Sequence, residues 1–452
     1  MHSRTQGSAV FEIGKMMEEY TFEKAVEYIL EIPKFSGKNS LEATREFYKY
    51  LGKPSEKSKA IHVAGTNGKG SVCAFTASVL MEAGFSVGMF TSPHLVSICE
   101  RIKLCGKDID KEAFLDVFTE LSNYLEVYRK DVNPEYHPSF FEWLFFMAAL
   151  YYEKTKPDYI LWETGLGGRL DATNILENQV ASVITQIGLD HMEYLGNTVE
   201  EIALEKAGIM RKYVPVIFYP FDKVAFKVLI DEALRSRATI NFVDTYRISF
   251  LNFGDKTIDF SMYTRYYGYI SLRLNTIARY QVANAALAVK VISHLPDTES
   301  ITKEHIIKGI AATKWPGRME EVAPGVFLEG AHNPDGIDAF LDTIREMSGK
   351  KKHLLFAVVS DKQYDEMIKR IALADLFQSY TVTTVGGARG LSTTQVRGLF
   401  EQYTDKGVNY EEDIVTAYKK CCDSLGEDEQ LFVAGSLYLV GQVKEYLGSL
   451  EA

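Results

Sequence analysis

The sequence predicts an α/β protein with two domains: an N-terminal phosphate-loop (P-loop) domain on a mainly parallel sheet and a smaller C-terminal Rossmann-like α/β domain. Three observations support this prediction. The 452 residues exceed the roughly 250–300 that a single hydrophobic core can organise. Short apolar runs alternate with amphipathic stretches, which is typical of parallel strands joined by helices. A glycine-rich turn follows the first apolar run, where nucleotide-binding α/β proteins hold phosphate.

The composition is that of a folded soluble protein, with 46% apolar, 25% charged and 12% aromatic residues. The formal net charge of -11, without any run of Lys and Arg, argues against a nucleic acid partner. The 5 cysteines lack metal-binding spacing and indicate a reducing cytoplasm. Residues 1–20 have no apolar stretch of signal-peptide length, and no segment reaches about 18 consecutive apolar residues. We therefore expect a cytoplasmic monomer that binds small molecules and does not interact with a membrane.

The elements of the first domain, which we place at residues 1–297, follow from the alternating pattern. Apolar runs predict strands, and the longer stretches between them predict helices. The expected strands cover residues 60–64, 86–91, 158–163 and 180–187, and the expected helices cover residues 71–83, 139–152, 198–209 and 281–295. Between residues 246 and 274, alternation at Ile258, Phe260 and Met262 predicts an antiparallel appendage.

A break in this pattern separates the two domains. Pro296 and the Trp-Pro-Gly sequence at 315–317 are turn signals, and they place a hinge at residues 298–318. The second domain then spans residues 319–452. Its expected strands cover residues 326–329, 353–359, 380–385 and 431–434. Each is followed by a loop and most by a helical stretch, which favours a Rossmann-like unit.

The strongest local signal is AIHVAGTNGKGS at residues 60–71, where an apolar strand runs into a glycine-rich turn and then a helix. Small residues let backbone N–H groups approach phosphate closely, the helix N-terminus adds positive potential, and Lys69 adds a full charge. The motif differs from the common GxxxxGK[ST] pattern at Val63 and Gly70. A glycine-rich turn with an incidental lysine is the alternative. The expected phosphate-binding residues are Thr66, Asn67, Gly68, Lys69, Gly70 and Ser71.

Two polar side chains follow neighbouring strands of the predicted sheet. Glu163 ends its strand, and a carboxylate at this edge is well placed to bind Mg²⁺, which prefers oxygen ligands. Ser92 follows another strand at the same edge, where ligands bind in open α/β sheets; a turn serine beside Pro93 is the alternative. We expect Arg169 and Asp171, in the glycine-rich stretch after Glu163, to pair with each other.

The third strand end offers both Asp190 and His191. Coordination chemistry alone favours Asp190 as a magnesium ligand because imidazole suits softer metals, but the sequence leaves the choice open. Further on, Thr198 and Glu201 form a capping box for a helix that carries Lys206. A lone lysine on a helix is usually solvated.

Turn-rich segments of the second domain also hold charged groups. Arg318 could neutralise phosphate through its fork of N–H donors. For Pro316, Gly317, Asn333 and Pro334 we expect roles in forming turns.

A set of segments spread over nearly the whole chain carries a family resemblance. They are HVAGTNGKGS at 62–71, TSPHL at 91–95, SFFEWLFFMAALYY at 139–152, ETGLGGRLDATN at 163–174, IGLDHMEYLG at 187–196, EKAGIM at 205–210, WPGRME at 315–320, GAHNPDG at 330–336, SDK at 360–362 and AGSLYLVG at 434–441. In this order they resemble folylpolyglutamate synthase and dihydrofolate synthase, the folate branch of the Mur ligase superfamily. The FFE segment before ETGLGGRLDATN separates this branch from the ligases that build peptidoglycan.

The resemblance implies a two-domain ligase whose first domain is similar to the central domain of Mur ligases and binds ATP at the phosphate loop. It implies that a carboxylate of dihydropteroate, of a tetrahydrofolate polyglutamate, or of both attacks the γ-phosphate. The amine of L-glutamate then converts the acyl phosphate to an amide, and ADP and phosphate leave. Two magnesium ions would stabilise the charge that develops. The alternatives are a Mur-type ligase acting on a cell-wall precursor and a phosphate-loop ATPase switch without ligase activity.

The resemblance also implies the roles of individual residues. Ser92, Glu163 and His191 match the family's magnesium ligands, so the resemblance favours His191 over Asp190. Lys206 matches a lysine that the family carbamylates, a modification that turns a cation into a carboxylate.

Residues from later in the chain match further parts of the family's site. Asn284, Arg318 and Glu329 match contacts to ATP, and His332 matches a residue that helps to place the incoming glutamate. The expected catalytic residues are Lys69, Lys206 and His332. Two positions depart from the family pattern: Glu329 stands where Asp is usual, and Cys99 stands where Asn is common, in a loop near the pterin site.

Overall fold

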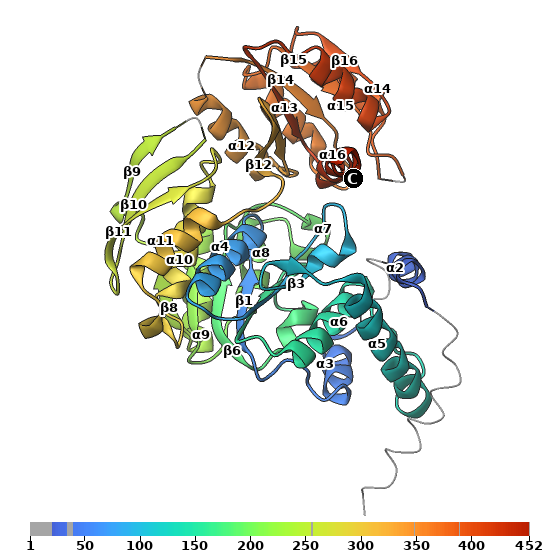
Figure 1. The fold of residues 1–452 in the computed structure, drawn as a ribbon, viewed down its shortest axis with the longest axis vertical. Coiled ribbons are helices and arrows are strands. Elements are labelled where there is room, and N and C mark those ends of the chain that lie inside the picture. The colour runs from blue at the N-terminus through green and yellow to red at the C-terminus, as the bar shows by residue number, and fades with distance from the viewer. Residues whose placement is uncertain (1–19, 34–38, 255, 348, 388, 452) are drawn as a thin grey trace, which may run out of the picture.

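The computed structural model describes residues 20–33, 39–254, 256–347, 349–387 and 389–451. It holds an eight-stranded sheet with a three-stranded sheet beside it, which we call the N-terminal unit, and a six-stranded sheet, which we call the C-terminal unit (Figure 1). The predicted fold class is therefore confirmed. The stretch at residues 1–20, where we expect no signal peptide, lies outside the described residues except for Tyr20.

The eight-stranded sheet places four of the predicted strands at its centre. Its strands are β1 (Lys59–Ala64), β2 (Val87–Phe90), β3 (Ile102–Leu104), β4 (Lys107–Asp108), β5 (Tyr159–Glu163), β6 (Gln179–Ile184), β7 (Pro215–Phe218) and β8 (Thr239–Phe242). They lie in the order β4-β3-β2-β5-β1-β6-β7-β8. Pairing is parallel except for β3, which is antiparallel to both β2 and β4. The predicted strands correspond to β1, β2, β5 and β6, whereas the sequence pattern does not predict the other four.

Helices cover both faces of this sheet. They are α2 (Phe22–Glu31), α3 (Leu41–Tyr50), α4 (Lys69–Glu82), α5 (Lys111–Asp131), α6 (Phe140–Thr155), α7 (Met192–Leu195), α8 (Val199–Ala207), α9 (Lys223–Ser236), α10 (Gln281–Ile292) and α11 (Lys303–Ala312). The 3-10 helices are η1 (Ile98–Arg101), η2 (Ala172–Ile175), η3 (Thr245–Arg247) and η4 (Thr298–Ser300).

Side chains of the central strands alternate between two cores. Ile61 and Val63 pack with residues of α4, α10 and α11, whereas Ala60 packs with α2, α3, α5 and α6. This alternation follows from the period of two in a strand. Because both faces are buried, such strands are mostly apolar, apart from buried polar residues such as His62, and this makes their sequences recognisable as strands.

The predicted antiparallel appendage is present. It consists of β9 (Ile248–Phe253), β10 (Ile258–Thr264) and β11 (Gly268–Leu274) in the order β11-β10-β9. Ile258, Phe260 and Met262 of β10 are buried in the core that also holds α4 and α10. The alternation in the sequence therefore marks the buried face of this small sheet.

The C-terminal unit is a six-stranded sheet between two layers of helices. Its strands are β12 (Arg318–Ala323), β13 (Val326–Glu329), β14 (Lys351–Phe356), β15 (Ser379–Val382), β16 (Val408–Tyr410) and β17 (Glu429–Ala434), and its helices are α12 (Pro334–Glu346), α13 (Tyr364–Leu373), α14 (Thr393–Phe400), α15 (Ile414–Asp423) and α16 (Leu437–Glu451). The order is β12-β13-β17-β14-β15-β16, parallel except for the β12–β13 pair. Helices α12 to α14 pack on one face and α15 and α16 on the other.

Helix α11 lies within the predicted hinge but packs into the core of the N-terminal unit. Ile306 and Ile310 are buried there, and the hydroxyl of Ser78 on α4 donates to the carbonyl of Gly309 at 2.7 Å. Only residues 313–317 then connect α11 to β12. The boundaries 1–297, 298–318 and 319–452 stay a prediction.

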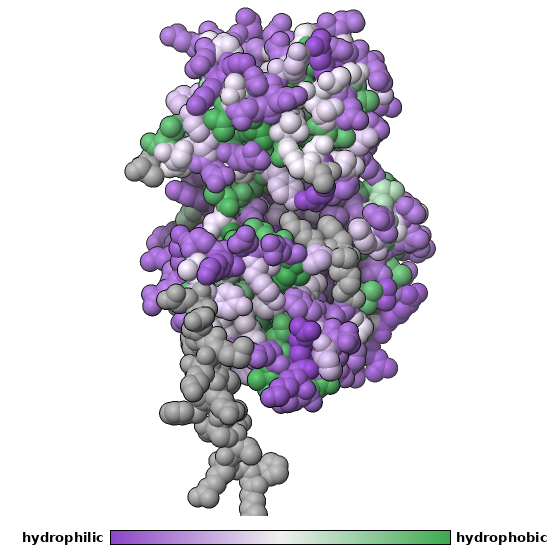
Figure 2. Space-filling model, turned by 90° about the vertical axis from the view of Figure 1, so that its right-hand side faces the viewer, coloured by the Kyte–Doolittle hydropathy of each residue, from purple (hydrophilic) through white to green (hydrophobic). Residues whose placement is uncertain are grey.

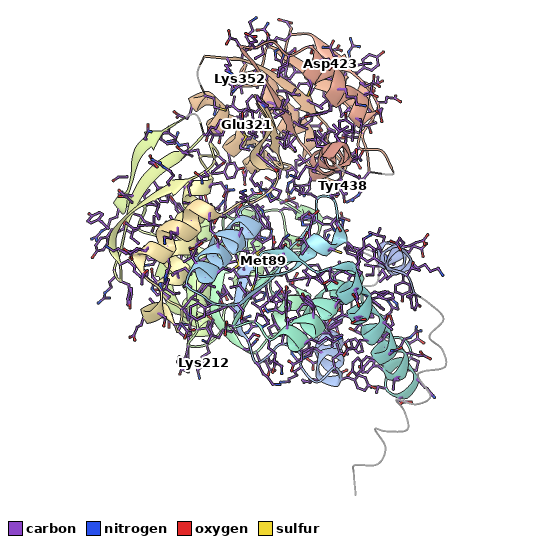
Figure 3. The ribbon with its side chains drawn as sticks, in the orientation of Figure 1. Met89, Lys212, Glu321, Lys352, Asp423 and Tyr438 are labelled. Atoms are coloured by element: carbon purple, nitrogen blue, oxygen red, sulfur yellow. The ribbon has the colours of Figure 1, made fainter. Side chains whose placement is uncertain are left out.

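The face of the molecule in Figure 2 is mostly hydrophilic, with hydrophobic residues scattered among polar ones. Across the parts of the chain that the structure describes, no helix combines the length and apolar character needed to span a membrane. Tyr438, in α16, lies on the side of the C-terminal unit that faces the N-terminal unit (Figure 3). The C-terminal unit contacts the phosphate loop through Asn333, which bonds to Asn67.

Candidate active site

A cavity of about 410 Å³ lies between the two units, at the carboxyl ends of β1, β2 and β5. Open parallel sheets bind ligands at this edge. The N-terminal unit contributes the phosphate loop, the segments after β2 and β5, and the start of α7. The C-terminal unit contributes the start of β12 and the loop after β13. Among the residues that line the cavity are Thr66, Asn67, Gly68, Lys69, Gly70, Ser71, Ser92, Glu163, His191, Lys206, Asn284, Arg318, Glu329 and His332. The structure therefore brings all the predicted site residues together.

The phosphate loop joins β1 to α4, and a side chain would clash at three glycines of its motif, among them Gly68 and Gly70. Gly68 has a φ of +89°, and a Cβ there would come within 2.4 Å of the Asn284 side-chain oxygen. A Cβ at Gly70 would come within 2.6 Å of the Trp315 ring. These contacts explain why glycines stand at 68 and 70 in this version of the motif.

Lys69 and Glu163 approach each other at the base of the cavity. The Lys69 ammonium donates to the carbonyls of Gly65 and Thr66 at 3.1 and 3.2 Å and lies 3.9 Å from Glu163 Oε1. The other carboxylate oxygen accepts from the backbone N–H of Ser92 at 3.1 Å. Burial raises the pKa of Glu163, although Lys69 opposes the shift. A cation beside this carboxylate would favour its ionised form.

Lys206 is buried, contrary to the solvated position that is usual for a helical lysine. Its ammonium donates to the carbonyl of Gly65 at 2.8 Å, so it contacts the same loop as Lys69. Burial and the nearby positive charge of Lys69 lower the pKa of Lys206 to about 7. A substantial fraction of this amine is therefore uncharged near neutral pH.

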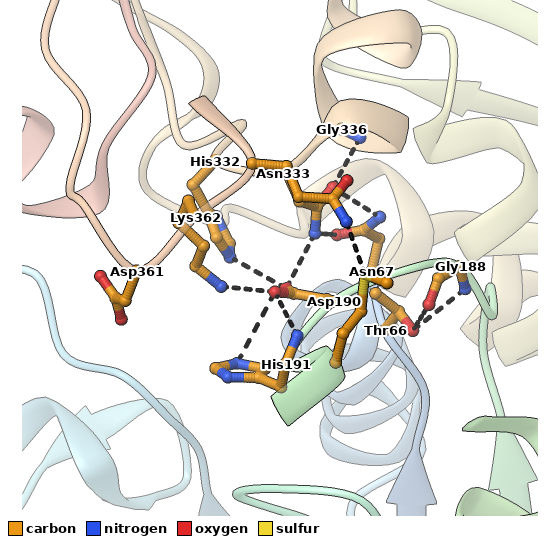
Figure 4. A network of polar contacts seen from close by, with 12 residues as sticks. Thr66, Asn67, Gly188, Asp190, His191, His332, Asn333, Gly336, Asp361 and Lys362 are labelled. Carbon is orange, nitrogen blue, oxygen red and sulfur yellow. Dashed lines mark hydrogen bonds and ion pairs between the residues drawn. The ribbon is translucent and has the colours of Figure 1, made fainter. Parts of the chain in front are cut away.

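His191 directly precedes α7 and has a left-handed backbone conformation, with a φ of 51°. Burial lowers its pKa to about 4, so the imidazole is neutral at pH 7 and can act as a ligand. Asp190 is the magnesium ligand that coordination chemistry alone favours, but in the structure its carboxylate is taken up by hydrogen bonds. It accepts from the Lys362 ammonium at 2.6 Å and from the Asn333 side-chain amide at 3.0 Å, both across the interface between units (Figure 4).

The same network joins the phosphate loop to the C-terminal unit. The side-chain amides of Asn67 and Asn333 donate to each other's carbonyl oxygens at 3.2 and 3.0 Å. Asn333 also caps α12 by accepting from the backbone N–H of Gly336 at 2.8 Å, and Pro334 is the first residue of that helix. Of the four residues expected to form turns, Pro316 and Gly317 lie in the turn before β12, whereas Asn333 and Pro334 cap and begin a helix. The sequence gives no sign of the bridge to Asn67. Lys362 belongs to the SDK motif at 360–362, but the sequence does not indicate that it pairs with Asp190.

His332 faces the same network. Its Nδ1 lies 2.8 Å from the carbonyl of Gly330, and because a carbonyl can only accept, Nδ1 carries a proton. Its Nε2 lies 3.9 Å from Asp190. Burial, reinforced by Lys362, lowers the pKa of His332 to about 4. The neutral ring therefore has a lone pair on Nε2.

Two of the remaining predicted ATP contacts, Asn284 and Glu329, are held by residues at the start of α10. The Asn284 side-chain amide donates to Gln281 at 2.9 Å, and Gln281 donates to the hydroxyl of Ser71 at 3.1 Å. Glu329, directly opposite Arg318 in the β12–β13 pair, accepts from the hydroxyl of Tyr280 at 2.6 Å. Gln281 and Tyr280 are not among the predicted site residues, because neither belongs to a charged or glycine-rich motif.

The expected pairing of Arg169 with Asp171 is wrong. Arg169 donates through Nη2 to Glu205 on α8 at 2.6 Å. Asp171 instead accepts from the backbone N–H groups of Gly165 and Leu166, both at 2.9 Å. Backbone donors take this carboxylate because the glycine-rich loop folds back over it.

Ser92, Glu163 and His191 form a sparse donor set for a metal. Within the described residues, no group of three or more His, Cys, Asp and Glu side chains is arranged to hold an ion. One hydroxyl, one buried carboxylate and one neutral imidazole fit Mg²⁺ if phosphate oxygens and water complete its shell, as is usual at nucleotide sites.

Comparisons with known proteins show which families the two units resemble. The Mur ligase middle domain model matches residues 145–292, and the Mur ligase glutamate ligase domain model matches residues 317–437. The folylpolyglutamate synthase of Lacticaseibacillus casei is 28% identical, over 94% of this chain and 98% of its own length. The structure of Mycobacterium tuberculosis folylpolyglutamate synthase complexed with ADP and AMPPCP is 26% identical, with a TM-score of 0.85 over 94% of this chain and 98% of that one.

The dihydrofolate synthase/folylpolyglutamate synthase of Bacillus subtilis (strain 168) is 34% identical over 427 residues, which cover 92% of this chain and 96% of that protein. The motifs, the cavity between the units and this relationship lead to one conclusion: the chain belongs to the folylpolyglutamate synthase/dihydrofolate synthase family of Mur ligases.

Proposed function

We propose that the chain is an ATP-dependent ligase that joins L-glutamate to the carboxylate of a folate-type acceptor, either dihydropteroate, a tetrahydrofolate polyglutamate, or both. One observation carries the proposal most directly. The phosphate loop, with Lys69 beside Glu163 and Lys206, faces His332 and Arg318 of the C-terminal unit across one cavity. Such an arrangement can activate a carboxylate with ATP on one side and admit an amine from the other.

ATP would lie with its phosphates on the backbone of residues 66–71, where N–H groups and the helix N-terminus favour anions. Lys69 would neutralise the transferring phosphoryl group. Asn284 and Arg318, both on the cavity wall, would contact the nucleotide, and Glu329 would hold the strand that carries Arg318.

Magnesium would be held by Ser92, Glu163 and His191, and we propose two ions, in keeping with the family. Bound there, Mg²⁺ would neutralise the phosphate oxygens and orient the γ-phosphate. The support for this assignment is that all three side chains line the cavity near Lys69 and that the imidazole is neutral.

Lys206 would become carbamylated. Its neutral amine attacks CO₂, an N–C bond forms, a proton leaves, and a carboxylate replaces the ammonium. The pKa of about 7 supports this step, because only an uncharged amine can attack. The resulting anion would face the positive charge of Lys69 and the metal.

The reaction then proceeds in two displacements. An oxygen of the acceptor carboxylate attacks the γ-phosphorus, the bond to the β–γ bridging oxygen breaks, and ADP leaves. The amine of glutamate attacks the carbonyl carbon of the acyl phosphate, and phosphate departs as the amide forms. The free lone pair on His332 Nε2 would accept a hydrogen bond from the incoming amine.

We also propose that the protein acts as a cytoplasmic monomer without a nucleic acid or membrane partner. Both halves of the cavity come from one chain, so catalysis needs no second copy. All the cysteines are free thiols, as a reducing compartment requires.

The test is ATP-dependent transfer of labelled L-glutamate, run in parallel on dihydropteroate and on a tetrahydrofolate. Label in at least one folate product, with one ADP formed per amide, is expected. ATP turnover that does not depend on glutamate would identify an ATPase switch. Label found only in a cell-wall precursor would identify a Mur-type ligase on another substrate.

A further inference from the structure

A buried chain of side-chain hydrogen bonds crosses the N-terminal unit from β6 to the loop after Glu163. Gln179 of β6 contacts Nδ1 of His62 at 2.6 Å, and Nε2 of His62 contacts the hydroxyl of Thr173 at 2.7 Å. That hydroxyl donates to Asp171 at 2.6 Å. All four side chains are buried, and His62 and Thr173 are fully inaccessible. None of them belongs to the proposed catalytic or ATP-binding set.

The direction of each bond follows from its donors. Thr173 uses its only proton on Asp171, so its oxygen must accept from His62 Nε2. His62 Nδ1 therefore has the lone pair and accepts from the amide of Gln179. This is the neutral tautomer protonated on Nε2. Burial lowers the pKa of His62 to about 3, so the ring is neutral. Each group in the chain then donates its hydrogen bond toward Asp171.

The chain ends on the wall of the cavity. Asp171 Oδ1 accepts from Thr173, through both its hydroxyl and its backbone N–H, and Oδ2 accepts from the backbone N–H groups of Gly165 and Leu166 at 2.9 Å each. Gly165 and Leu166 line the cavity, and Glu163 lies two residues before Gly165. The position of the Asp171 carboxylate thus sets the path of the backbone beside the reacting groups.

The same loop also rests against Lys206. A Cβ at Gly168 would come within 2.9 Å of the Lys206 carbonyl oxygen, and the backbone N–H of Arg169 donates to the carbonyl of Glu205 at 2.7 Å. A shift of the loop would therefore reach both Glu163 and Lys206.

We propose that His62 and Thr173 are positioning residues for the ligation reaction, which fix the loop at 164–168 by orienting the Asp171 carboxylate. The proposal rests on the proposed function. Neither residue touches substrate, and each acts through Asp171 on the cavity wall. Misplacing reacting groups by about 1 Å can cost about 100-fold in rate, so a buried second layer of this kind can control turnover.

Two matched pairs of variants test the proposal. Thr173→Val keeps the shape of the side chain but removes the hydroxyl that links His62 to Asp171. Thr173→Ser keeps that hydroxyl. His62→Leu removes the donor, and His62→Gln can place an amide N–H at the position of Nε2. The first readout is hydrogen–deuterium exchange of the peptide that contains Gly165 and Leu166. The second is kcat and KM for the acceptor, with ADP affinity and Tm measured on the same samples.

We expect Thr173→Val and His62→Leu to expose the Gly165 and Leu166 amides to exchange and to lower kcat/KM for the acceptor by about tenfold or more, with ADP affinity within about twofold of wild type. Thr173→Ser and His62→Gln should restore most of both. Unchanged exchange in Thr173→Val would overturn the proposal, as would equal losses in both members of a pair. Exchange does not depend on catalysis. A wild-type protein without ligase activity would therefore refute the proposed function, while the exchange data would still decide whether His62 and Thr173 fix the loop.

Discussion

Asn67 of the phosphate loop and Asn333 of the C-terminal unit exchange two side-chain hydrogen bonds, 3.2 and 3.0 Å long. The pair joins the loop that would hold phosphate to the helix cap of α12. The contact between the two units and the conformation of the loop are therefore coupled through one pair of amides.

Replacing Asn333 with Asp should weaken this coupling without damaging α12. Asp caps a helix as well as Asn, but it has no N–H to donate to Asn67 or Asp190, and it adds a like charge beside Asp190. Losing two hydrogen bonds of about 1 kcal/mol each should lower kcat/KM for ATP by about 30-fold. Small-angle scattering with ADP should show a larger radius of gyration. The double variant N333D/D190N should recover part of both losses, and an N333D protein with wild-type scattering and kinetics would contradict the coupling.

Replacing Lys69 with Ala should reduce ligation by about 100-fold or more, because a charge that meets the transferring phosphoryl group is lost. Labelled glutamate transfer measures the activity, and circular dichroism checks the fold. Lys57→Ala, at an exposed lysine of the same unit, serves as the control and should stay active. Near-normal ligation by a folded Lys69→Ala protein would remove the loop from the mechanism.

Replacing Glu163 with Gln should separate metal binding from nucleotide binding. The amide removes the negative charge beside Lys69, so ADP without Mg²⁺ should bind at least as tightly as to wild type. The gain in ADP affinity on adding Mg²⁺ should fall by about tenfold. Calorimetry with and without Mg²⁺ gives both values, and Glu205→Gln is the matched control. If both proteins respond equally to Mg²⁺, Glu163 is not a ligand.

Replacing Lys206 with Met should stabilise the protein at low pH in buffer free of CO₂. Burial lowers the pKa of Lys206 from 10.5 to about 7, so between these values the unfolded chain binds a proton that the folded protein does not. The free energy of unfolding of wild type therefore rises with pH across this window, and the cost of the buried charge is fully present below pH 7.

Lys206→Met removes that cost, so its gain should be on the order of a few kcal/mol at pH 6 and should shrink as the pH approaches 10.5. Urea unfolding at pH 6 and pH 9 measures the difference. Lys223→Met, at an exposed position on α9, should show no such trend. An equal gain at both pH values would show that packing, not charge, is responsible.

Replacing Lys206 with Ala should abolish ligation, and short carboxylic acids should partly restore it. The truncated side chain leaves room for a carboxylate in the position of the carbamate, near Lys69. Glutamate transfer measured against acetate concentration tests this, and Lys69→Ala should show no rescue. Full activity of Lys206→Ala without added acid would exclude Lys206 from the site.

The central strands and the phosphate loop are predictable from the sequence because their causes are local. Both faces of β1 and β5 are buried, so each strand is mostly apolar, and the loop needs small residues at consecutive positions. The short strands β3 and β4 are not predicted, since three and two residues give too little pattern. Lys206 could have been found: it lies three residues after the buried Ala203, and so on the apolar face of α8.

Contacts between the units have no local signal. The Asp190–Lys362 ion pair joins residues 172 positions apart, and it depends on how one unit sits on the other. The cap role of Asn333 is local and predictable, whereas its bond to Asn67 is not. Likewise, Arg169 and Asp171 are close in sequence, but the loop between them turns one toward α8 and the other toward its own backbone.

The absence of a side chain at Gly70 has a consequence for the connection between the units. Trp315 belongs to the short connector after α11, and its ring fills the space where a Cβ at Gly70 would lie. The connector is thus anchored on the first turn of α4. An alanine at position 70 would push on this anchor and change the angle at which the C-terminal unit approaches, so a defect in the phosphate loop would present as a defect in domain orientation.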